Sequence, residues 1–273
     1  MEQKRTPPRP QAKPRLTYEQ WKRRKLLRLA RNWVLFLGGC ALVIALLTSG
    51  ILWLLPRVHA MLAGPQVFTA APYDATGYVF DPDDARLVLV NANLPYEEEP
   101  SPVLDVADEA TGLQLEAEAA MQYRSMAAAA KADGVELTLV AGYRDADARA
   151  EAFAQQKQLY QDRHKSEEKA AALAASIQPA ADACEHGTGY ALDLCSADYS
   201  NLDTGFAGTK AYEWLTAYAA EYGFILRYPQ EHQAATGVVF EPWHWRFVGV
   251  ENALAIRASG LSLEEFLALQ KAS

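Results

Sequence analysis

Cysteine and histidine are scarce in this sequence. Only three cysteines and five histidines occur among 273 residues, and no internal repeat is evident. Three cysteines are too few for a disulfide-rich scaffold. The length suits one well-cored domain or two small ones, and the hydrophobic fraction of 50% is typical of a globular protein.

Basic residues are depleted from most of the chain. Residues 1–31 hold eleven Lys and Arg but only two acidic groups, whereas residues 32–273 carry 15 basic and 32 acidic groups, a net charge of -17. An acidic body of this kind would repel phosphates, which excludes nucleic acid as its main partner.

Long apolar runs are also absent, with one exception at residues 33–55. "WVLFLGGCALVIALLTSGILWLL" contains 23 residues without a charge, enough to cross a bilayer as a helix, and Trp33 and Trp53 lie near its ends. The basic residues precede the run, so the positive-inside rule places the N-terminus in the cytoplasm. We therefore predict a basic cytoplasmic tail over 1–32, a transmembrane signal anchor over 33–55 and an extracytoplasmic remainder.

Two other interpretations of this segment remain open. "VHA" at 58–60 could serve as a signal-peptidase site, although the apolar run exceeds the roughly 7–15 residues of a signal-peptide core. "LGGC" at 37–40 resembles a lipoprotein box, but Cys40 lies in the middle of the apolar run. The length of the run favours an uncleaved, single-pass anchor in the cell membrane.

The extracytoplasmic part divides at a change in composition. Residues 56–83 are rich in Pro, Gly and Ala and predict a stem that holds a domain at 84–273 off the membrane. Within that domain, irregularly alternating patterns predict an α+β fold with a small, mostly antiparallel sheet and helices packed around it. The expected strands are 85–96, 135–144 and 224–228, and the expected helices are 115–134, 145–177, 209–224, 250–259 and 262–270.

The stretch "CEHGTGYALDL" at 184–194 places a histidine and an aspartate seven residues apart. A regular strand would point His186 and Asp193 to opposite faces, but Gly187 and Gly189 permit a turn or bulge that re-aims the histidine. In the strand that follows, Asp193 lies between two leucines. A buried aspartate in such a place requires a cation or several hydrogen-bond donors.

A second stretch, "EPWHWRFVG" at 241–249, places a carboxylate and an imidazole three residues apart. Pro242 biases Glu241 toward extended or polyproline II backbone, whose repeat of three residues would direct Glu241 and His244 the same way. Trp243, Trp245 and Phe247 alternate along the same segment, a pattern more typical of core packing than of substrate binding.

Together the two stretches supply the donors of a catalytic zinc site. His186, Asp193 and His244 would bind zinc and leave the fourth position open, while Glu241 would act as general base. The HExxH helix of many zinc peptidases is absent. A single buried His or Asp is more often structural than catalytic, so the hypothesis depends on the two stretches meeting.

Both stretches resemble the paired signatures of the VanY-type D-alanyl-D-alanine carboxypeptidases, "SEHxTGxAxDL" and "EPWHxRYVG". "AGYR" at 141–144 is similar to the family's "SGYR", and "YGFILRYP" at 222–229 matches it without change. The resemblance extends from about residue 87 to residue 249. It implies the fold shared with hedgehog signalling domains and lysostaphin-type endopeptidases.

The resemblance also implies a role for each motif residue. His186, Asp193 and His244 would hold one zinc ion per chain, Glu241 would be the base, and Arg144 would polarise the scissile carbonyl and stabilise the oxyanion. Cys184 replaces a serine that helps to place the substrate in the family, and Trp243 is a further candidate for substrate binding. Ala141 replaces the serine of "SGYR", and Arg149 stands where many relatives have glutamine.

Cys184 and Cys195 bracket the first stretch and suggest a structural hypothesis. If residues 184–195 formed a hairpin, the two sulfur atoms could meet as a disulfide outside the cell, whereas two free buried thiols are the alternative.

The expected function is that of a membrane-anchored zinc carboxypeptidase that removes the C-terminal D-alanine from peptidoglycan stem peptides. The alternatives are an L,D-carboxypeptidase or a cell-wall endopeptidase on the same scaffold, and, in another class, a metal-bearing cell-wall binding module without turnover. Glu241 beside a complete ligand set favours catalysis over the binding module.

Overall fold

The computed structural model describes residues 17–62, 68–163 and 166–272, which form two compact units. The first unit ends at Gln66 and the second begins at Val67.

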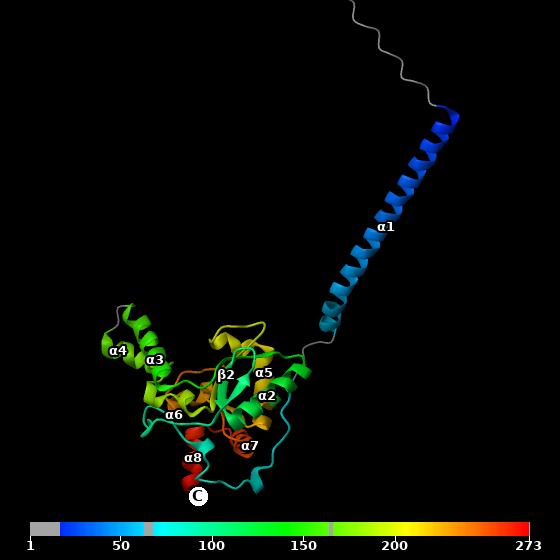
Figure 1. Cartoon of the computed structure of the whole chain (residues 1–273). Coiled ribbons are helices and arrows are strands. Elements are labelled where there is room, and N and C mark those ends of the chain that lie inside the picture. The colour runs from blue at the N-terminus through cyan, green and yellow to red at the C-terminus, as the bar shows by residue number, and fades with distance from the viewer. Residues whose placement is uncertain (1–16, 63–67, 164–165, 273) are drawn as a thin grey trace, which may run out of the picture. The chain divides into compact units, whose positions relative to one another are not determined.

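The first unit is one long helix, α1 (Tyr18–Leu62), of 45 residues (Figure 1). The predicted apolar span lies within α1, and the described part of the chain contains one helix long and apolar enough to cross a membrane, which is also the property of a signal sequence. Residues 18–32 of the predicted cytoplasmic tail are helical, because they are rich in Leu, Arg and Lys, which favour helix. The tail residues before them lie outside the described residues.

The second unit has an α+β fold, which confirms the predicted class. Its main sheet has four antiparallel strands in the order β3-β4-β6-β5, and a separate antiparallel pair is formed by β1 and β2. The strands are β1 (Leu104–Asp108), β2 (Leu113–Glu116), β3 (Leu137–Ala141), β4 (Ala191–Ser196), β5 (Phe224–Leu226) and β6 (His244–Phe247).

Helices surround this sheet, and α3 and α4 form a hairpin at one end of the unit (Figure 1). The α-helices are α2 (Ala117–Ala132), α3 (Ala146–Gln161), α4 (Glu167–Ala175), α5 (Lys210–Tyr218), α6 (Gln233–Thr236), α7 (Val250–Ser259) and α8 (Leu263–Ala272). Short 3-10 turns are η1 (Ala75–Gly77), η2 (Ala85–Leu87), η3 (Ala181–Ala183), η4 (Glu185–Thr188), η5 (Thr204–Gly208), η6 (Ala219–Tyr222) and η7 (Gln230–His232).

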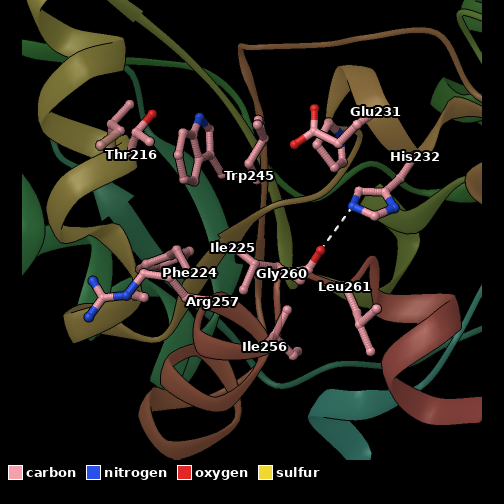
Figure 2. A pocket seen from close by; sticks show the side chains of 14 residues that line it. Thr216, Phe224, Ile225, Glu231, His232, Trp245, Ile256, Arg257, Gly260 and Leu261 are labelled. Carbon is pink, nitrogen blue, oxygen red and sulfur yellow. Dashed lines mark hydrogen bonds between the residues drawn. The ribbon is translucent and has the colours of Figure 1, made fainter. Parts of the chain in front are cut away.

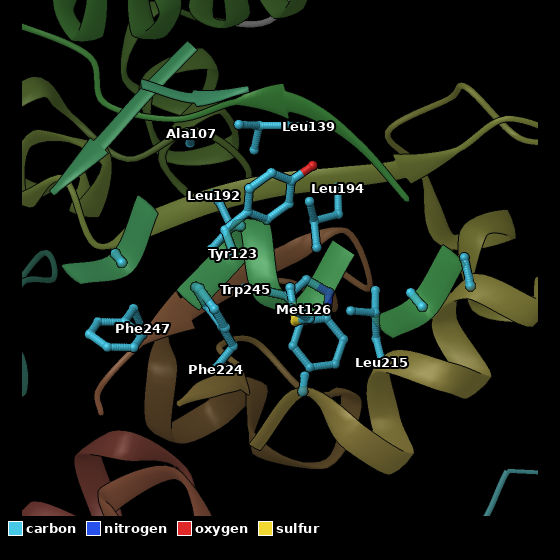
Figure 3. Packing of buried hydrophobic residues seen from close by; sticks show 14 of the residues in the cluster. Ala107, Tyr123, Met126, Leu139, Leu192, Leu194, Leu215, Phe224, Trp245 and Phe247 are labelled. Carbon is cyan, nitrogen blue, oxygen red and sulfur yellow. The ribbon is translucent and has the colours of Figure 1, made fainter. Parts of the chain in front are cut away.

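The main core lies between one face of the sheet and the helices α2 and α5. Figure 3 shows Leu192 and Leu194 of β4 with Trp245 of β6, packed against Tyr123 and Met126 of α2. Each buried side chain of this size contributes about 1.5–3 kcal/mol through removal of apolar surface from water. Since strand residues alternate between faces, the residues between these core positions point to the other face of the sheet.

The residues predicted as a stem differ from that prediction where they are described. Tyr78 packs into the cluster of α7 and α8, its hydroxyl donates to Asn252 Oδ1 at 2.6 Å, and Phe68 stacks edge-on against Tyr218. Aromatic side chains bury large apolar areas, so residues 68–83 belong to the compact unit and do not act as a spacer. The unit therefore begins earlier than the predicted boundary at 84.

The strand predicted at 85–96 is wrong. Leu87 and Val90 are buried, whereas Val88 and Leu94 are exposed, and the backbone forms η2 and then a tight turn. The carbonyls of Arg86 and Val88 accept hydrogen bonds from Nη2 of Arg246 at 3.0 and 2.9 Å. A buried guanidinium thus satisfies acceptors that a neighbouring strand would otherwise have to satisfy.

Candidate metal centre

Strand register brings the ends of the two sequence motifs together. Asp193 of β4 pairs directly with His244 of β6, and both side chains lie on the face of the sheet opposite the main core. Oδ1 of Asp193 is 2.9 Å from Nδ1 of His244, and Oδ2 of Asp193 is 3.3 Å from Nε2 of His186. The three side chains are almost completely buried.

These donors fit a zinc ion. One ligand atom from each of His186, Asp193 and His244 lies within 4.8 Å of the others. Tetrahedral zinc with bonds of about 2.0–2.1 Å separates its ligand atoms by roughly 3.3 Å. The distances of 2.9 and 3.3 Å from Asp193 oxygens to the two histidines are close to this value. Two imidazoles and one carboxylate are a donor set typical of zinc, and three protein ligands leave one position for water or substrate.

His186 reaches the site from η4, not from the arm of a hairpin. Gly189 ends η4 with φ of +76°, which a residue with a side chain adopts only at a cost in energy, and the chain then enters β4. Nδ1 of His186 lies 2.7 Å from the carbonyl of Gly142, and donation there leaves Nε2 as the acceptor nitrogen facing Asp193. The glycines therefore re-aim the histidine, as the sequence predicted.

Glu241 and His244 are joined by a turn, so the predicted polyproline geometry is wrong. The backbone N–H of His244 donates to the carbonyl of Glu241 at 3.1 Å, which closes a turn over Pro242 and Trp243. Proline fixes its own φ at a value suited to the second position of such a turn. The turn still brings the Glu241 carboxyl to the wall of the cleft that His244 also lines.

The protonation states of the donors follow from burial and from each other. Burial lowers the pKa of His186, which keeps this imidazole neutral. Burial alone would raise the pKa of Asp193 and lower that of His244. His186 and then His244 hold the Asp193 pKa below its usual range, and the hydrogen bond to Asp193 raises the His244 pKa to about 9. In the metal-free protein a proton therefore occupies the position between these two side chains, as a cation would.

Burial also raises the pKa of Glu241, to about 8. The neighbouring Asp193 carboxylate acts in the same direction, whereas His244 and Arg144 lower it. A carboxyl whose pKa is this close to neutrality can both accept and release a proton, which suits a general base.

Arg144 points into the same site from the loop after β3. Its Nη2 lies 3.2 Å from Oδ2 of Asp193, and its Nη1 donates to Oε1 of Gln178 at 3.3 Å. The backbone N–H of Arg144 donates to the carbonyl of His186 at 3.1 Å, which fixes this loop against the ligand segment. Arg149 supports the loop from behind, because its Nη1 donates to the carbonyl of Arg144 at 2.8 Å.

A cleft of about 150 Å³ opens over the donors. Every residue proposed from the sequence for metal binding, catalysis or substrate contact lines it. They are Arg144, Cys184, His186, Asp193, Glu241, Trp243 and His244, and the cleft also contains Ile177, Gln178, Pro179, Glu185, Leu202 and Tyr228.

Several of these additional residues were missed by the sequence analysis. Tyr228 belongs to the quoted "YGFILRYP", yet nothing in that segment indicated that its ring packs against His244 with 4.9 Å between ring centroids. Gln178 precedes a proline in a segment predicted as the end of a helix and carries no motif. Glu185 would point away from His186 in a regular strand, whereas its side chain is wholly buried beside the donors.

Of the two alternatives left open for Cys184 and Cys195, the structure shows the free thiols, both of them buried. Cys195 lies opposite Thr138 of β3, with its thiol 3.6 Å from the carbonyl of Asn201. Cys184 precedes η4, and its sulfur accepts from Nε2 of Gln178 at 3.6 Å. Residues 185–188 form a 3-10 turn, so Cys184 does not lie on a hairpin strand that pairs with the strand of Cys195.

A second hollow, of about 210 Å³, lies between α5, β5 and α7 (Figure 2). Its walls are mainly apolar, with Leu215, Ile225 and Trp245 among them. His232 at its edge has both ring nitrogens engaged, one 3.1 Å from the carbonyl of Gly260 and the other 2.8 Å from Oε2 of Glu265. His232 therefore lies outside the cluster of metal-ligand candidates that His186 and His244 form with Asp193.

A metal-dependent hydrolase is the class of protein that this fold and donor set define. Comparison with known proteins gives the family. The sequence profile of the VanY family, "D-alanyl-D-alanine carboxypeptidase", matches residues 112–250, about half of the chain. The chain belongs to the VanY D-alanyl-D-alanine carboxypeptidase family.

Individual relatives agree with this assignment. A D-alanyl-D-alanine carboxypeptidase of Enterococcus faecalis is 30% identical over 191 residues, which cover 70% of this chain and 69% of the relative. The structure of VanYB in complex with D-alanine-D-alanine aligns with a TM-score of 0.61 at 30% identity, covering 67% of this chain and 97% of VanYB.

Two further solved structures bear on the metal and on specificity. A mutant of the D,D-pentapeptidase VanY in complex with Zn(II) aligns with a TM-score of 0.61 at 30% identity, covering 67% of this chain and 99% of that protein. The LD-carboxypeptidase LdcB aligns with a TM-score of 0.55 at 29% identity, covering 73% of this chain and 94% of LdcB.

Proposed function

We propose that this chain is a zinc-dependent D-alanyl-D-alanine carboxypeptidase that removes the C-terminal D-alanine from peptidoglycan stem peptides. The observation that carries the proposal is the convergence of His186, Asp193 and His244 on one point beside Glu241 and Arg144. The similarity to VanYB, whose structure contains D-alanine-D-alanine, supports the substrate class.

His186, Asp193 and His244 would hold one zinc ion per chain. Zinc bound by such ligands lowers the pKa of a coordinated water toward neutrality and polarises a carbonyl oxygen. The neutral state of His186 and the ionised state of Asp193 suit this role, since metal ligands must bind without their protons.

Glu241 would move the proton. Its carboxylate accepts a proton from the attacking water and delivers it to the nitrogen of the departing D-alanine. Burial keeps the Glu241 pKa high enough for the second half of that task. Because the carboxyl is only 4% exposed, bulk water does not compete for the proton.

Arg144 would stabilise the negative charge on the carbonyl oxygen of the tetrahedral intermediate. Its guanidinium is about a quarter exposed in the cleft, fixed on one side by Gln178 and on the other by Asp193. Cys184 and Trp243 line the same cleft and would contact the peptide. A permanent cation in a partly dehydrated site contributes more to such stabilisation than it would in water.

The helix α1 would anchor the enzyme in the cell membrane with the catalytic unit outside. Its apolar stretch is long enough to span a bilayer, and six of its basic residues precede that stretch while only Arg57 follows it. Protease added to intact cells should degrade residues 68–272 and spare the N-terminal segment. Protection of the C-terminal unit would contradict this orientation.

Incubation of the full-length, detergent-solubilised chain with defined stem peptides tests the activity. A pentapeptide ending in D-Ala-D-Ala should lose one D-alanine, seen by mass spectrometry as the tetrapeptide. Release of the terminal D-alanine from a tetrapeptide, by cleavage of the bond that joins it to the preceding L-configured residue, would instead assign L,D-carboxypeptidase activity. The similarity to the LD-carboxypeptidase LdcB makes this activity the second candidate. Binding of either peptide without any product would assign a binding module.

A further inference from the structure

A buried carboxylate that has no role in the proposed chemistry lies behind one of the metal ligands. Glu185 precedes His186 in η4, and its side chain is completely inaccessible to solvent. Its Oε2 lies 3.8 Å from Nε2 of His244, on the side of the ring away from Asp193. The two nitrogens of His244 thus face two different carboxylates.

Two guanidinium groups fix the position of this carboxylate. Oε1 of Glu185 is 2.8 Å from Nε of Arg227 and 3.0 Å from Nη1 of Arg246. Arg246 is itself held by backbone carbonyls, and Arg227 forms a bidentate pair with Glu264 at 2.8 and 2.6 Å. Two buried cations balance two carboxylates, and these ion pairs restrict rotation of the Glu185 side chain.

The remaining oxygen of Glu185 has no hydrogen-bond donor among the residues that the structure describes. Nε2 of His244 likewise has no hydrogen-bond partner among those residues, and both atoms are buried. A buried polar atom without a partner has lost its hydrogen bonds to water and gained none in return, which is why such atoms are rare unless a function requires them. Here the two orphaned atoms face each other across a gap that is about 0.8 Å longer than a normal hydrogen bond of roughly 3.0 Å.

The chemistry of imidazole explains why this pair matters for a metal site. When Nδ1 of a neutral histidine binds a metal, the ring proton must be on Nε2, which becomes a donor. In His244 that donor would point at Oε2 of Glu185. The ring of Tyr228 packs against His244 and is itself covered by the guanidinium of Arg227, so the imidazole has little freedom to turn elsewhere.

We propose that Glu185 is a positioning residue for the metal centre: its Oε2 accepts a hydrogen bond from Nε2–H of His244 and so fixes the tautomer and ring orientation that direct Nδ1 at the metal. The inference rests on the proposed function, in that it takes His244 as a zinc ligand. Arg227 and Arg246 would hold Glu185 in place for this role.

The alternative role for Glu185 is purely structural, as a counter-ion for the two buried arginines. Glu264 provides a matched control, because it also pairs with Arg227, while its other hydrogen-bond partner among the described residues is Asn91 and not His244. If Glu185 acted only through the arginines, neutralising Glu264 should affect the metal centre in a similar way. If Glu185 acts through His244, the two substitutions should differ in zinc affinity even where they cost similar stability.

The test is zinc affinity of the full-length, detergent-solubilised chain, measured by competition with a chromophoric chelator. We expect Glu185→Gln to weaken zinc binding by about 10–100-fold, a typical loss when the partner of a metal-binding histidine is removed. Glu264→Gln should change zinc affinity by less than about threefold, although both variants lower the melting temperature of the metal-free protein. Equal zinc affinity in wild type and Glu185→Gln, or an equal loss in both variants, would overturn the inference.

A second measurement needs no substitution and covers the case in which Glu185→Gln does not fold. In the zinc-loaded wild-type chain, nitrogen NMR of the histidines should show the Nε2 atom of His244 protonated, with a proton protected from exchange. A His244 ring whose Nε2 binds zinc and whose Nδ1 carries the proton would overturn the inference while leaving the proposed function intact. Failure of the wild-type chain to bind zinc would instead overturn both.

Discussion

Asp193 and His244 lie directly opposite each other on β4 and β6, with Oδ1 of Asp193 2.9 Å from Nδ1 of His244. Cross-strand neighbours of this kind have their Cβ atoms about 4.5–5.5 Å apart, so the backbone alone ensures that the two donors meet. The sheet therefore preorganises two of the three proposed ligands before any metal binds.

The first prediction concerns the metal itself. The purified chain should contain about one zinc ion, and His186→Ala or His244→Ala should abolish zinc binding and peptide hydrolysis together, because two remaining ligands hold zinc weakly. His232→Ala is the control, since His232 is engaged with Gly260 and Glu265 outside the site. Elemental analysis and product assays measure both effects, and full hydrolysis after exhaustive chelation would refute a zinc-dependent reaction.

The second prediction separates chemistry from binding at Glu241. Glu241→Gln should retain zinc and bind peptide normally while kcat falls by about 10²–10⁴-fold, because the amide cannot accept the proton of water. Glu231→Gln, at the edge of the second hollow, should leave kcat unchanged. Near-normal turnover by Glu241→Gln would rule out its role as the base.

The third prediction concerns the pH dependence of stability in the metal-free protein. The pKa of Glu241 is raised from 4.5 to about 8 in the folded state, so the folded protein holds a proton that the unfolded chain has released. This group therefore makes folding less favourable as pH rises from 4.5 to 8, and its effect is constant above that window.

Glu241→Gln has no titratable group at this position, so the difference in stability between the variant and the wild type should reveal the contribution of Glu241. In the presence of chelator, the melting temperature of Glu241→Gln should exceed that of the wild type by an amount that grows between pH 4.5 and 8. Thermal denaturation monitored by circular dichroism measures the difference. A gap that shrinks as pH rises would show that the Glu241 pKa is not raised.

The fourth prediction concerns the geometry of Arg144. Arg144→Lys keeps the positive charge but loses the planar fork that contacts Gln178 and Asp193 together, so kcat/KM should fall by about 10²-fold or more. Gln178→Ala should give a smaller loss, because the guanidinium keeps its second partner. Steady-state kinetics measure both, and an Arg144→Lys enzyme of normal rate would show that the arginine acts only as a distant charge.

The fifth prediction concerns the cysteines. Because Cys184 and Cys195 are free and buried, native protein should react slowly with thiol reagents at both positions, and unreduced protein should show three thiols after denaturation. Mass spectrometry of alkylated peptides gives the count at each site. Detection of a Cys184–Cys195 disulfide would contradict the described position of the two side chains.

The sequence alone determined the donors and the face on which they lie. Alternation in "YALDL" separates Asp193 from the leucines of the core, and the two glycines before it allow His186 to turn toward the same side. These are local properties, set by the two-residue period of a strand and by the backbone freedom of glycine. The α+β class and the helices α2, α7 and α8 also followed from local patterns.

Tertiary structure decided what depends on partners far away in the chain. Residues 85–90 are as apolar as a buried strand, yet Arg246 takes their carbonyls, and a guanidinium 158 or 160 residues distant leaves no trace in their local pattern. The two-residue period of a strand would direct Glu185 away from His186, but these residues form a 3-10 turn, whose period is three, and both side chains line the same cleft. The packing of β4, β6 and η4 likewise decides that Cys184 and Cys195 stay apart and that Glu185 lies behind His244. That packing depends on long-range contacts, which the local sequence does not contain.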